Sequence, residues 1–304
     1  MDENLNKVIG ERPEDIALKK KPGKVGTFFF CLWVVVAVLL IQAGVSVVGI
    51  IPKAVSFLLE SGGDTNVYAV KYTEYIQSSS ILTILQFVAE IVCIVALGIW
   101  YYNGYVKKDK KNGVYKPFIQ KFDGFKGVLF ILCGCVATWG LAAILSLLVS
   151  MLLPSTESQL NEMLNLALGG NAVIGFITGA LLAPICEELA MRGIILQRSK
   201  RAFGIIGCLV ISAVLFGVLH ANILQAIYVL PMGFFWGFVG YRYNSVIPCI
   251  FCHIINNFIS LVIPVAISPI IIFVVFGAAT AFIGAKAGYF NGAAYEMEES
   301  KNDN

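Results

Sequence analysis

The stretch from Ala202 to Ala285 contains one formally charged side chain, that of Arg242. A segment this long with so little charge cannot cover the surface of a water-soluble domain, so it must be surrounded by protein or lipid. It has room for about four membrane-spanning helices at ~20 residues each. The whole chain is 58% apolar and 13% charged, whereas a soluble protein is about 25% charged. We therefore exclude an ordinary soluble domain and a disordered chain, and the net charge of +3 gives no reason to expect a nucleic-acid partner.

Eight apolar runs are each long enough to cross a bilayer, allowing for tilt. They predict an all-α fold: a polytopic membrane helix bundle with about eight transmembrane helices, in a multi-pass protein of the cell membrane. The first run has no obvious small-residue cleavage site, so we expect a permanent anchor. All 8 cysteines lie in these runs, where a thiol behaves as a small hydrophobic group, so we expect no disulfide framework. The runs lie at about 26–50, 80–101, 127–152, 172–191, 203–221, 223–241, 246–264 and 268–288.

Basic side chains are concentrated in alternate connections between the runs. The N-terminal tail and the 102–126 connection are rich in lysine, whereas the connection from Leu153 to Asn171 contains no basic residue. Because cytoplasmic loops carry the excess of lysine and arginine, both termini are predicted to face the cytoplasm. The same basic runs could attract anionic lipid, but topology alone is the simpler interpretation.

The apolar runs and their connections divide the chain into five parts. A connection at 51–79 is too long for a simple turn, so we expect an external loop, part of which lies on the membrane surface or covers a site. We see no separate soluble domain, which leaves the function to the membrane-embedded part. The predicted parts are a cytoplasmic N-terminal tail (1–25), N-terminal transmembrane helices and loops (26–165), a core that contains the motifs described below (166–264), a last transmembrane helix (265–290) and a cytoplasmic C-terminal tail (291–304).

Ionisable side chains inside the apolar runs are the first candidates for chemistry. A charge at the centre of a membrane helix costs roughly 2.5–3.5 kcal/mol on insertion scales, so it is kept where it serves a purpose. Glu187 and Glu188 lie in the fourth run, and His220 and His253 are the only histidines of the chain. Glu90 lies in the second run. Nothing in the sequence connects Glu90 with the other candidates, and we favour a structural role for it.

The two adjacent glutamates are predicted to have different roles. Glu188 and Arg192 are spaced i, i+4, so they share a helical face and can form an ion pair. Glu187 points about 100° away. We infer that Arg192 holds Glu188 as a structural brace, while Glu187 is available as a general base or acid. The alternative is an interfacial charge cluster without a catalytic role. Pro184 cannot donate to the carbonyl of Ala180, so the helix is predicted to open at this point.

Both histidines belong to i, i+4 pairs. Phe216 shares a helical face with His220, and His253 shares one with Asn257. Taken alone, each histidine is more simply a packing residue, and an asparagine in a membrane helix is often an interhelical hydrogen-bonding group. Together with the glutamate pair, however, they supply a base, proton shuttles and oxyanion donors. These are the parts that hydrolysis of an amide requires.

The motifs E-E-x-x-x-R, F-x-x-x-H and H-x-x-x-N follow one another on successive apolar runs, and all three are complete. In this order and setting they resemble the CPBP family of CAAX proteases and bacteriocin-processing enzymes, also called the Abi family, which are intramembrane endopeptidases. The resemblance covers about a third of the chain, from roughly Asn171 to Pro264. It implies an eight-helix type of bundle with a polar, cytoplasm-facing cavity in the membrane.

The resemblance also implies the roles of the site residues. Glu187 and His220 would activate a water that attacks the scissile carbonyl, and His253 and Asn257 would stabilise the oxyanion. Family members resemble glutamate-dependent proteases, so catalysis without a metal is expected. Glu187, His220 and His253 could instead bind a divalent metal such as zinc, which leaves a position for water. The implied supporting residues are Glu188, Arg192 and Phe216.

Two other classes of function are open. A non-catalytic membrane scaffold or bacteriocin-immunity protein of the same fold would tolerate the loss of Glu187. An ion-coupled transporter would use intramembrane carboxylates and histidines as an ion pathway, but we see no inverted repeat. For a protease the expected partners are the lipid bilayer and a membrane-associated protein or peptide substrate. The resemblance allows prenylated CAAX segments and peptide precursors, and no residue chooses between them.

The apparent depths of Glu187 and His220 in the membrane conflict. By hydropathy, Glu187 lies toward the cytoplasmic half, while His220 lies at the outer end of the fifth run. Two arrangements would bring them together. Either the fifth helix continues beyond His220 through Ala221, Asn222 and Ile223, or the fourth reaches to about Lys200 and carries Glu187 deeper.

Overall fold

The computed structural model describes residues 22–78, 80–111, 113, 115, 117–262 and 268–290. Within these residues every regular element is a helix, which confirms the predicted all-α fold class. The cytoplasmic tails predicted at 1–25 and 291–304 lie almost entirely outside the described residues.

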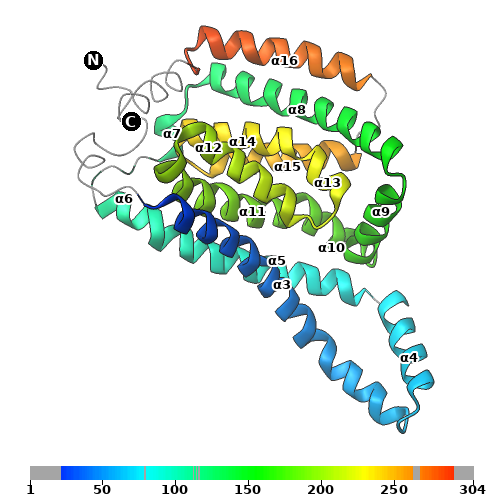
Figure 1. Ribbon diagram of the computed structural model, residues 1–304. Coiled ribbons are helices and arrows are strands. Elements are labelled where there is room, and N and C mark those ends of the chain that lie inside the picture. Colours follow the sequence, from blue (N-terminus) through cyan, green and yellow to red (C-terminus); the bar gives the residue numbers. More distant parts are fainter. Residues whose placement is uncertain are drawn as a thin grey trace.

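Each of the eight apolar runs forms a helical segment (Figure 1). The elements derived from these runs are α3 (Lys24–Glu60), α5 (Ile81–Tyr101), α8 (Phe125–Leu152), α10 (Ala172–Ile177), η2 (Thr178–Leu182), α11 (Ala183–Glu188), η3 (Leu189–Ile195), α12 (Leu196–Leu219), α13 (Ile223–Tyr228), α14 (Leu230–Tyr243), α15 (Ile247–Val262) and α16 (Pro269–Lys286). The connections contribute α4 (Thr65–Ser78), η1 (Tyr102–Val106), α6 (Lys107–Lys111), α7 (Phe118–Lys121) and α9 (Ser155–Leu168).

Among the described residues, 5 helical stretches are long and apolar enough to cross a membrane. The longest, Ala172–Leu219, contains two of the predicted runs, because Gly204 interrupts it with a φ of 65° and a ψ of −174°. A positive φ of this kind suits glycine, which has no Cβ to clash. The chain doubles back at Gly204, since the Ser212 hydroxyl lies 3.4 Å from the Met191 carbonyl. The helices α14 and α15 are shorter, at 14 and 16 residues.

The prediction of a loop at 51–79 is wrong. Helix α3 continues to Glu60 and α4 follows it, so the connection is largely a helical hairpin that extends away from the bundle (Figure 1). Lys71 pairs with Glu60 at 2.7 Å, and the rings of Phe57 and Tyr75 meet edge to face at 5.7 Å. These contacts give the hairpin a packed side outside the bundle, which hydropathy alone does not reveal. The connection from Leu153 to Asn171 likewise contains a helix, α9.

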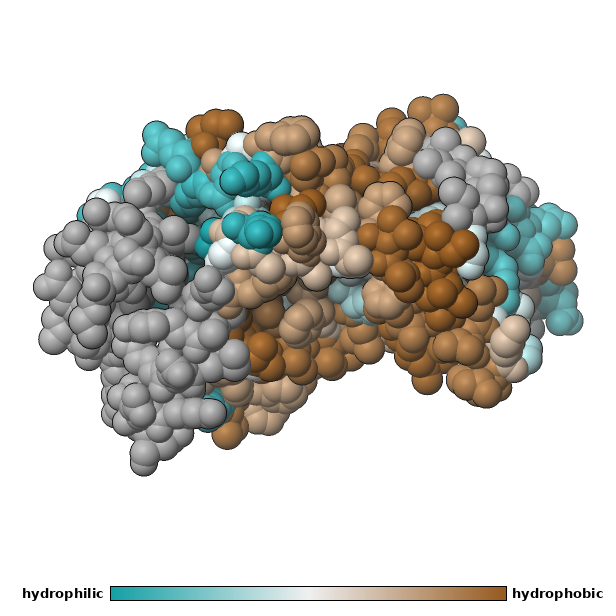
Figure 2. Space-filling view, turned by 90° about the horizontal axis from the view of Figure 1, so that it is seen from above, coloured by the Kyte–Doolittle hydropathy of each residue, from teal (hydrophilic) through white to brown (hydrophobic). Residues whose placement is uncertain are grey.

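The outer surface carries the band of apolar side chains expected of a membrane protein. Figure 2 shows a wide hydrophobic belt with hydrophilic groups toward the two ends. The exposed large apolar side chains of the molecule include Phe29 of α3, Met151 of α8 and Phe282 of α16. The start of α3 and the end of α16 lie at the same end of the bundle (Figure 1), as a chain with both termini on one side requires. That this side is the cytoplasmic one stays a prediction.

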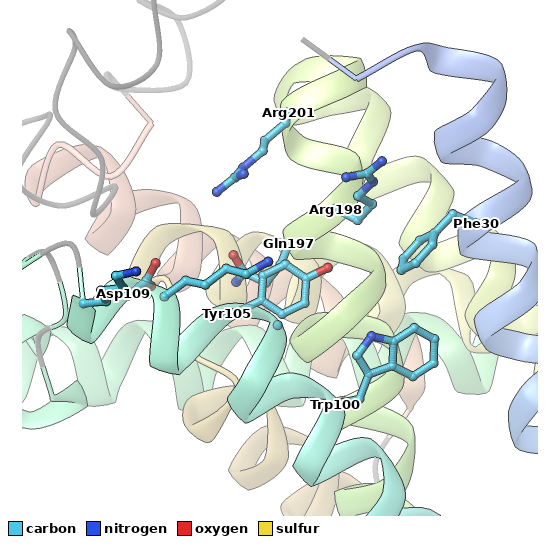
Figure 3. A pocket seen from close by; sticks show the side chains of 10 residues that line it. Phe30, Trp100, Tyr105, Asp109, Gln197, Arg198 and Arg201 are labelled. Atoms are coloured by element: carbon cyan, nitrogen blue, oxygen red, sulfur yellow. The ribbon is translucent and has the colours of Figure 1, made fainter. Parts of the chain in front are cut away.

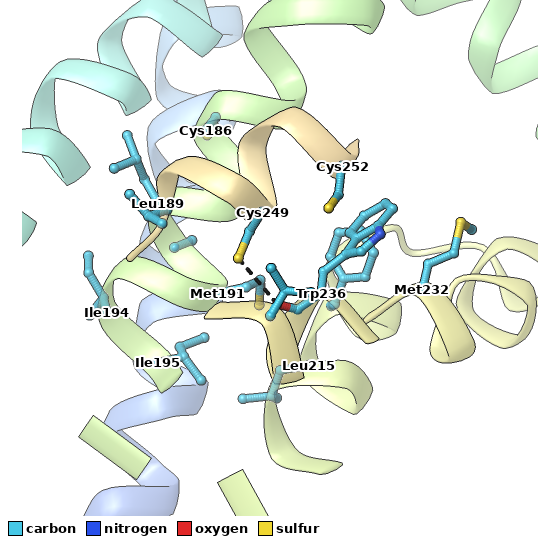
Figure 4. Packing of buried hydrophobic residues seen from close by; sticks show 14 of the residues in the cluster. Cys186, Leu189, Met191, Ile194, Ile195, Leu215, Met232, Trp236, Cys249 and Cys252 are labelled. Carbon is cyan, nitrogen blue, oxygen red and sulfur yellow. Dashed lines mark hydrogen bonds between the residues drawn. The ribbon is translucent and has the colours of Figure 1, made fainter. Parts of the chain in front are cut away.

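The main core lies where η3, α12, α14 and α15 meet, next to the segment that carries the two glutamates (Figure 4). Trp236 of α14 is fully buried there, and the Cys249 thiol lies 3.2 Å from its carbonyl oxygen. All the cysteines are free thiols, as predicted from their apolar surroundings. Gly134 and Gly140 let helices approach closely: a Cβ on Gly140 would lie 2.9 Å from the backbone nitrogen of Phe273 in α16.

Candidate active site

The segment that carries Glu187 and Glu188 departs from regular helix geometry on both sides. The short helix α11, which ends at Glu188, lies between the π-helical segments η2 and η3. Pro184 cannot donate a backbone hydrogen bond to the turn before it, and the π-helical turn η2 occupies that turn. The helix therefore departs from regular α geometry at the predicted place, and its opening onto a cavity stays a prediction. Single π-helical turns inside α-helices are frequent at functional sites, because they redirect side chains.

The predicted ion pair between Glu188 and Arg192 is confirmed and is completely buried. Arg192 donates from Nη1 to Glu188 Oε1 at 2.8 Å, and both side chains are 0% exposed. Its Nη2 donates to the carbonyl oxygen of Gly233 at 2.6 Å. The guanidinium also lies over the rings of Phe216, at 5.1 Å, and Trp236, at 5.8 Å. Neither Gly233 nor Trp236 stands in a motif, so their place in this cluster could not be predicted from the sequence.

Both histidines converge on Glu187, although the three residues come from three different helical segments. The Nε2 atom of His220 lies 3.9 Å from Glu187 Oε2, and Nε2 of His253 lies 3.7 Å from the same oxygen. Glu187 is in α11, His220 follows the end of α12, and His253 is in α15. The structure therefore brings together the residues that the three sequence motifs singled out.

The conflict in depth between Glu187 and His220 is resolved by the fourth helix. It continues beyond Lys200 as far as the interruption at Gly204, as the second arrangement requires, and Glu187 and His220 meet. The alternative, continuation of the fifth helix past His220, is wrong. Helix α12 ends at Leu219, and Ala221 has a φ of 51°, which a continuing α-helix does not allow.

Hydrogen bonds fix the orientation of both imidazole rings. His220 Nδ1 lies 2.8 Å from the carbonyl oxygen of Phe216, which can only accept, so Nδ1 carries a hydrogen and Nε2 faces Glu187. His253 Nδ1 lies 3.0 Å from the Glu188 carboxylate and is assigned the hydrogen for the same reason. Each histidine thus presents its second ring nitrogen to Glu187. An acceptor behind a histidine commonly sets the tautomer in this way.

The surroundings of the three groups are mostly apolar and aromatic. The His253 ring lies against Trp236 at 4.5 Å and against Phe216 at 5.5 Å. The side chains of His253, His220 and Glu187 are 5%, 11% and 19% exposed, so accessibility rises toward Glu187. Glu187 Oε2 is buried without a hydrogen-bond partner among the described residues. The group therefore holds an unused acceptor between two ring nitrogens.

Asn257 is held against the π-helical segment η2. Its Nδ2 donates to the carbonyl oxygen of Gly179 at 2.9 Å, and its Oδ1 accepts from Asn256 at 3.3 Å. One of the two amide hydrogens of Asn257 is thus committed to the backbone, which leaves the other for a ligand. The predicted role of Asn257 as an oxyanion donor stays a prediction.

The question of a metal ion concerns Glu187, His220 and His253. Among the described residues, no group of three histidine, cysteine, aspartate or glutamate side chains is arranged so that it could hold a metal ion. Glu187, His220 and His253, the set considered for zinc, are included in that statement. The Nδ1 atoms of the two histidines are turned toward Phe216 and Glu188, and their Nε2 atoms face Glu187.

Glu90 is connected with the site, which the sequence did not indicate. Its Oε1 accepts from Gln86 Nε2 at 2.7 Å and from Gln42 Nε2 at 3.0 Å, and the side chain is buried. The thiol of Cys186 is also within hydrogen-bonding reach of this carboxyl group. Because Cys186 precedes Glu187, Glu90 braces the segment that carries the glutamates against α3 and α5. The preferred structural role agrees with these contacts.

Comparisons with known proteins agree with the resemblance drawn from the motifs. No curated protein and no solved structure matches the chain. A family model does match, over residues 169–259, and its description is type II CAAX prenyl endopeptidase Rce1-like. The matched segment contains all three motifs, and with them Glu187, His220, His253 and Asn257. Over this segment, which is nearly the one predicted from the motifs, the chain is similar to the Rce1-like type II CAAX prenyl endopeptidases.

Proposed function

We propose that the protein is an intramembrane endopeptidase that hydrolyses a peptide bond of a membrane-associated protein or peptide. A CAAX-type prenylated segment is the substrate class that the family match favours. The observation that carries the proposal is the convergence of two oriented histidine nitrogens on one unpartnered oxygen of Glu187. The apolar belt and the long helices support a multi-pass protein in a lipid bilayer, which we assign to the cell membrane.

Glu187 and His220 activate the attacking water in this proposal. Their separation of 3.9 Å is longer than a direct hydrogen bond and is compatible with one water bridging them. His220 Nε2 has a lone pair, because its hydrogen is on Nδ1. Glu187 takes the proton as the water oxygen forms a bond to the scissile carbonyl carbon. The proton then passes to the leaving nitrogen as the C–N bond breaks, which is general acid–base catalysis by one carboxyl group.

His253 and Asn257 stabilise the oxyanion of the tetrahedral intermediate. For His253 Nε2 to donate, the ring must carry a hydrogen on both nitrogens, and the Glu188 carboxylate 3.0 Å from Nδ1 stabilises that imidazolium. Asn257 offers its second amide hydrogen. Donors placed in advance in a site with little water stabilise developing charge without the cost of reorganising solvent. Arg192 holds Glu188 in place, and Phe216 orients His220 and packs on His253.

The proposal needs no metal, and the arrangement of the candidate ligands supports that choice. Dialysis of the purified protein against a chelator is expected to leave proteolysis unchanged. Loss of activity that zinc restores would overturn the metal-free mechanism but not the assignment as a protease.

The proposed function is tested by comparing cells that make the native chain with cells that make Glu187→Gln at equal abundance. This substitution keeps the shape of the side chain and removes the base. Mass spectrometry of membrane proteins and released peptides should show cleavage products that vanish in the variant, while their precursors accumulate. Glu162→Gln, an exposed glutamate on α9, is the matched control and should behave as native. Matching profiles for Glu187→Gln and the native chain would favour a scaffold, an immunity protein or an ion-coupled transporter.

A further inference from the structure

A cavity of about 490 Å³ lies apart from the glutamate–histidine group (Figure 3). Its walls come from the start of α3, from the end of α5 with η1 and α6, and from the part of α12 before Gly204. None of Glu187, His220, His253 and Asn257 lines it. The cavity is therefore a second candidate site, at the end of the bundle where α3 begins.

The charge on the walls of the cavity is strongly positive. Four basic side chains line it, those of Lys108, Lys111, Arg198 and Arg201, against one carboxylate, that of Asp109. Such an excess in one concave place raises the local concentration of anions. The two arginines suit a phosphate in particular, because a guanidinium can donate two parallel hydrogen bonds to phosphate oxygens.

Arg198 is held in position by the protein rather than extended into solvent. Its guanidinium lies over the ring of Phe30 at 5.5 Å, and the side chain is only partly exposed. Its Nε is buried and has no hydrogen-bond partner among the described residues. The neighbouring Gln197, which also lines the cavity, is buried. An oriented arginine with an unused buried donor, beside a buried amide, is a prepared site for an anion.

The cavity also has an apolar side. Phe30 and Trp100 line it, and Figure 3 places them at the side nearer α3. On α3 next to Phe30, Phe29 and Trp33 are exposed, as expected of side chains that face lipid. Tryptophan is enriched where the acyl region of a bilayer meets its headgroups. The basic and aromatic sides together match a ligand that is anionic at one end and apolar at the other.

We propose that this cavity binds a phosphate group and that the headgroup of an anionic phospholipid supplies it. Basic pockets between membrane helices on the cytoplasmic side bind such headgroups, and this end is the one predicted to be cytoplasmic. A soluble phosphate compound is the other source of the same chemistry. The bound headgroup would tie α3 and α6 to the helical stretch that carries Glu187, because Arg198 follows Arg192 on that stretch.

The test measures lipid binding and does not depend on proteolysis. The purified full-length chain, freed of lipid in a non-ionic detergent, is titrated with dioleoyl-phosphatidylglycerol and with dioleoyl-phosphatidylcholine, and complexes are counted by native mass spectrometry. The variant pair is Arg198→Gln with Arg201→Gln. The matched control is Lys107→Gln with Lys126→Gln, which removes the same charge from exposed residues that do not line the cavity. Inorganic phosphate and glycerol phosphate are added as competitors.

Phosphatidylglycerol is expected to bind the native chain and the control variant equally. It should bind the arginine variant at least tenfold more weakly, and phosphatidylcholine should bind all three chains weakly. Equal weakening in the variant and the control, or equal binding of the two lipids, would overturn the proposal. Glycerol phosphate binding as tightly as the lipid would refute the lipid as the source. If the arginine pair fails to fold, Lys111→Gln, an exposed residue of the cavity wall, replaces it and must weaken phosphatidylglycerol binding.

Discussion

The buried pair of Glu188 and Arg192 allows a sharp test of how the site is held together. Arg192→Met keeps much of the side-chain volume but removes the ion pair at 2.8 Å and the hydrogen bond to Gly233 at 2.6 Å. Removing one partner of a buried ion pair costs about 3–5 kcal/mol, because the other charge stays buried. At 1.4 kcal/mol per factor of ten, this lowers the folded-to-unfolded ratio by roughly 10²–10³·⁵. Glu188→Gln should cost a comparable amount, since it leaves the guanidinium without a counter-charge.

The double variant separates this explanation from ordinary loss of packing. With both charges removed, neither is left buried alone, so the double variant should be more stable than the sum of the single effects by about 1–3 kcal/mol. The assay is equilibrium unfolding in mixed micelles, followed by the fluorescence of tryptophan, because Trp236 lies against the guanidinium. Lys71→Met with Glu60→Gln is the control cycle on an exposed ion pair and should show no measurable coupling. Additive effects of the two buried substitutions would refute the reasoning.

Two further predictions concern the neighbouring groups. His220→Ala should lower the rate of peptide cleavage by about 10²–10⁴-fold, the usual contribution of a general acid–base group, with little change in the unfolding midpoint; a rate within twofold of native would exclude His220 from the chemistry. Glu90→Ala should lower the unfolding midpoint, because it leaves two part-buried glutamine amides without their acceptor, at a cost of up to about 1 kcal/mol for each donor. Glu90→Gln retains an acceptor oxygen, so its unfolding midpoint should lie between those of Glu90→Ala and the native chain. Equal unfolding midpoints for all three chains would show that Glu90 does not stabilise this segment.

Much of the bundle could be predicted from the sequence, because a long apolar run by itself predicts a membrane-spanning helix. The pair of Glu188 and Arg192 was also predictable, since an i, i+4 spacing fixes a shared face whatever the tertiary structure. The helical hairpin at 51–79 was not, because α4 is polar enough to resemble a loop in hydropathy and Pro52 and Lys53 interrupt the apolar run of α3. The hydrogen bond from Arg192 to the carbonyl oxygen of Gly233 could not be predicted either, because every residue type has a backbone carbonyl group.

The length of the fourth helix shows a second limit of hydropathy. The charges of Arg198 and Arg201 suggest that the fourth helix leaves the membrane before them, yet the helix continues to Gly204. Both arginines line a cavity at the end of the bundle where α3 begins, and Arg201 is exposed there. A hydropathy profile counts charges but does not show where their side chains find polar surroundings. The chain reversal at one glycine likewise needed a backbone angle, a φ of 65°, that the sequence only permits.

The most direct test of the central claim is the rate at which the purified protein, in lipid vesicles, cleaves a prenylated CAAX peptide in ¹⁸O-labelled water. The native chain and Glu162→Gln should release a product that carries one ¹⁸O atom in its new carboxylate. Glu187→Gln should release it at least ~10²-fold more slowly, because the base that activates water is gone. Cleavage by Glu187→Gln at the native rate would contradict the assignment of Glu187 as that base, whatever the effect of the other substitutions.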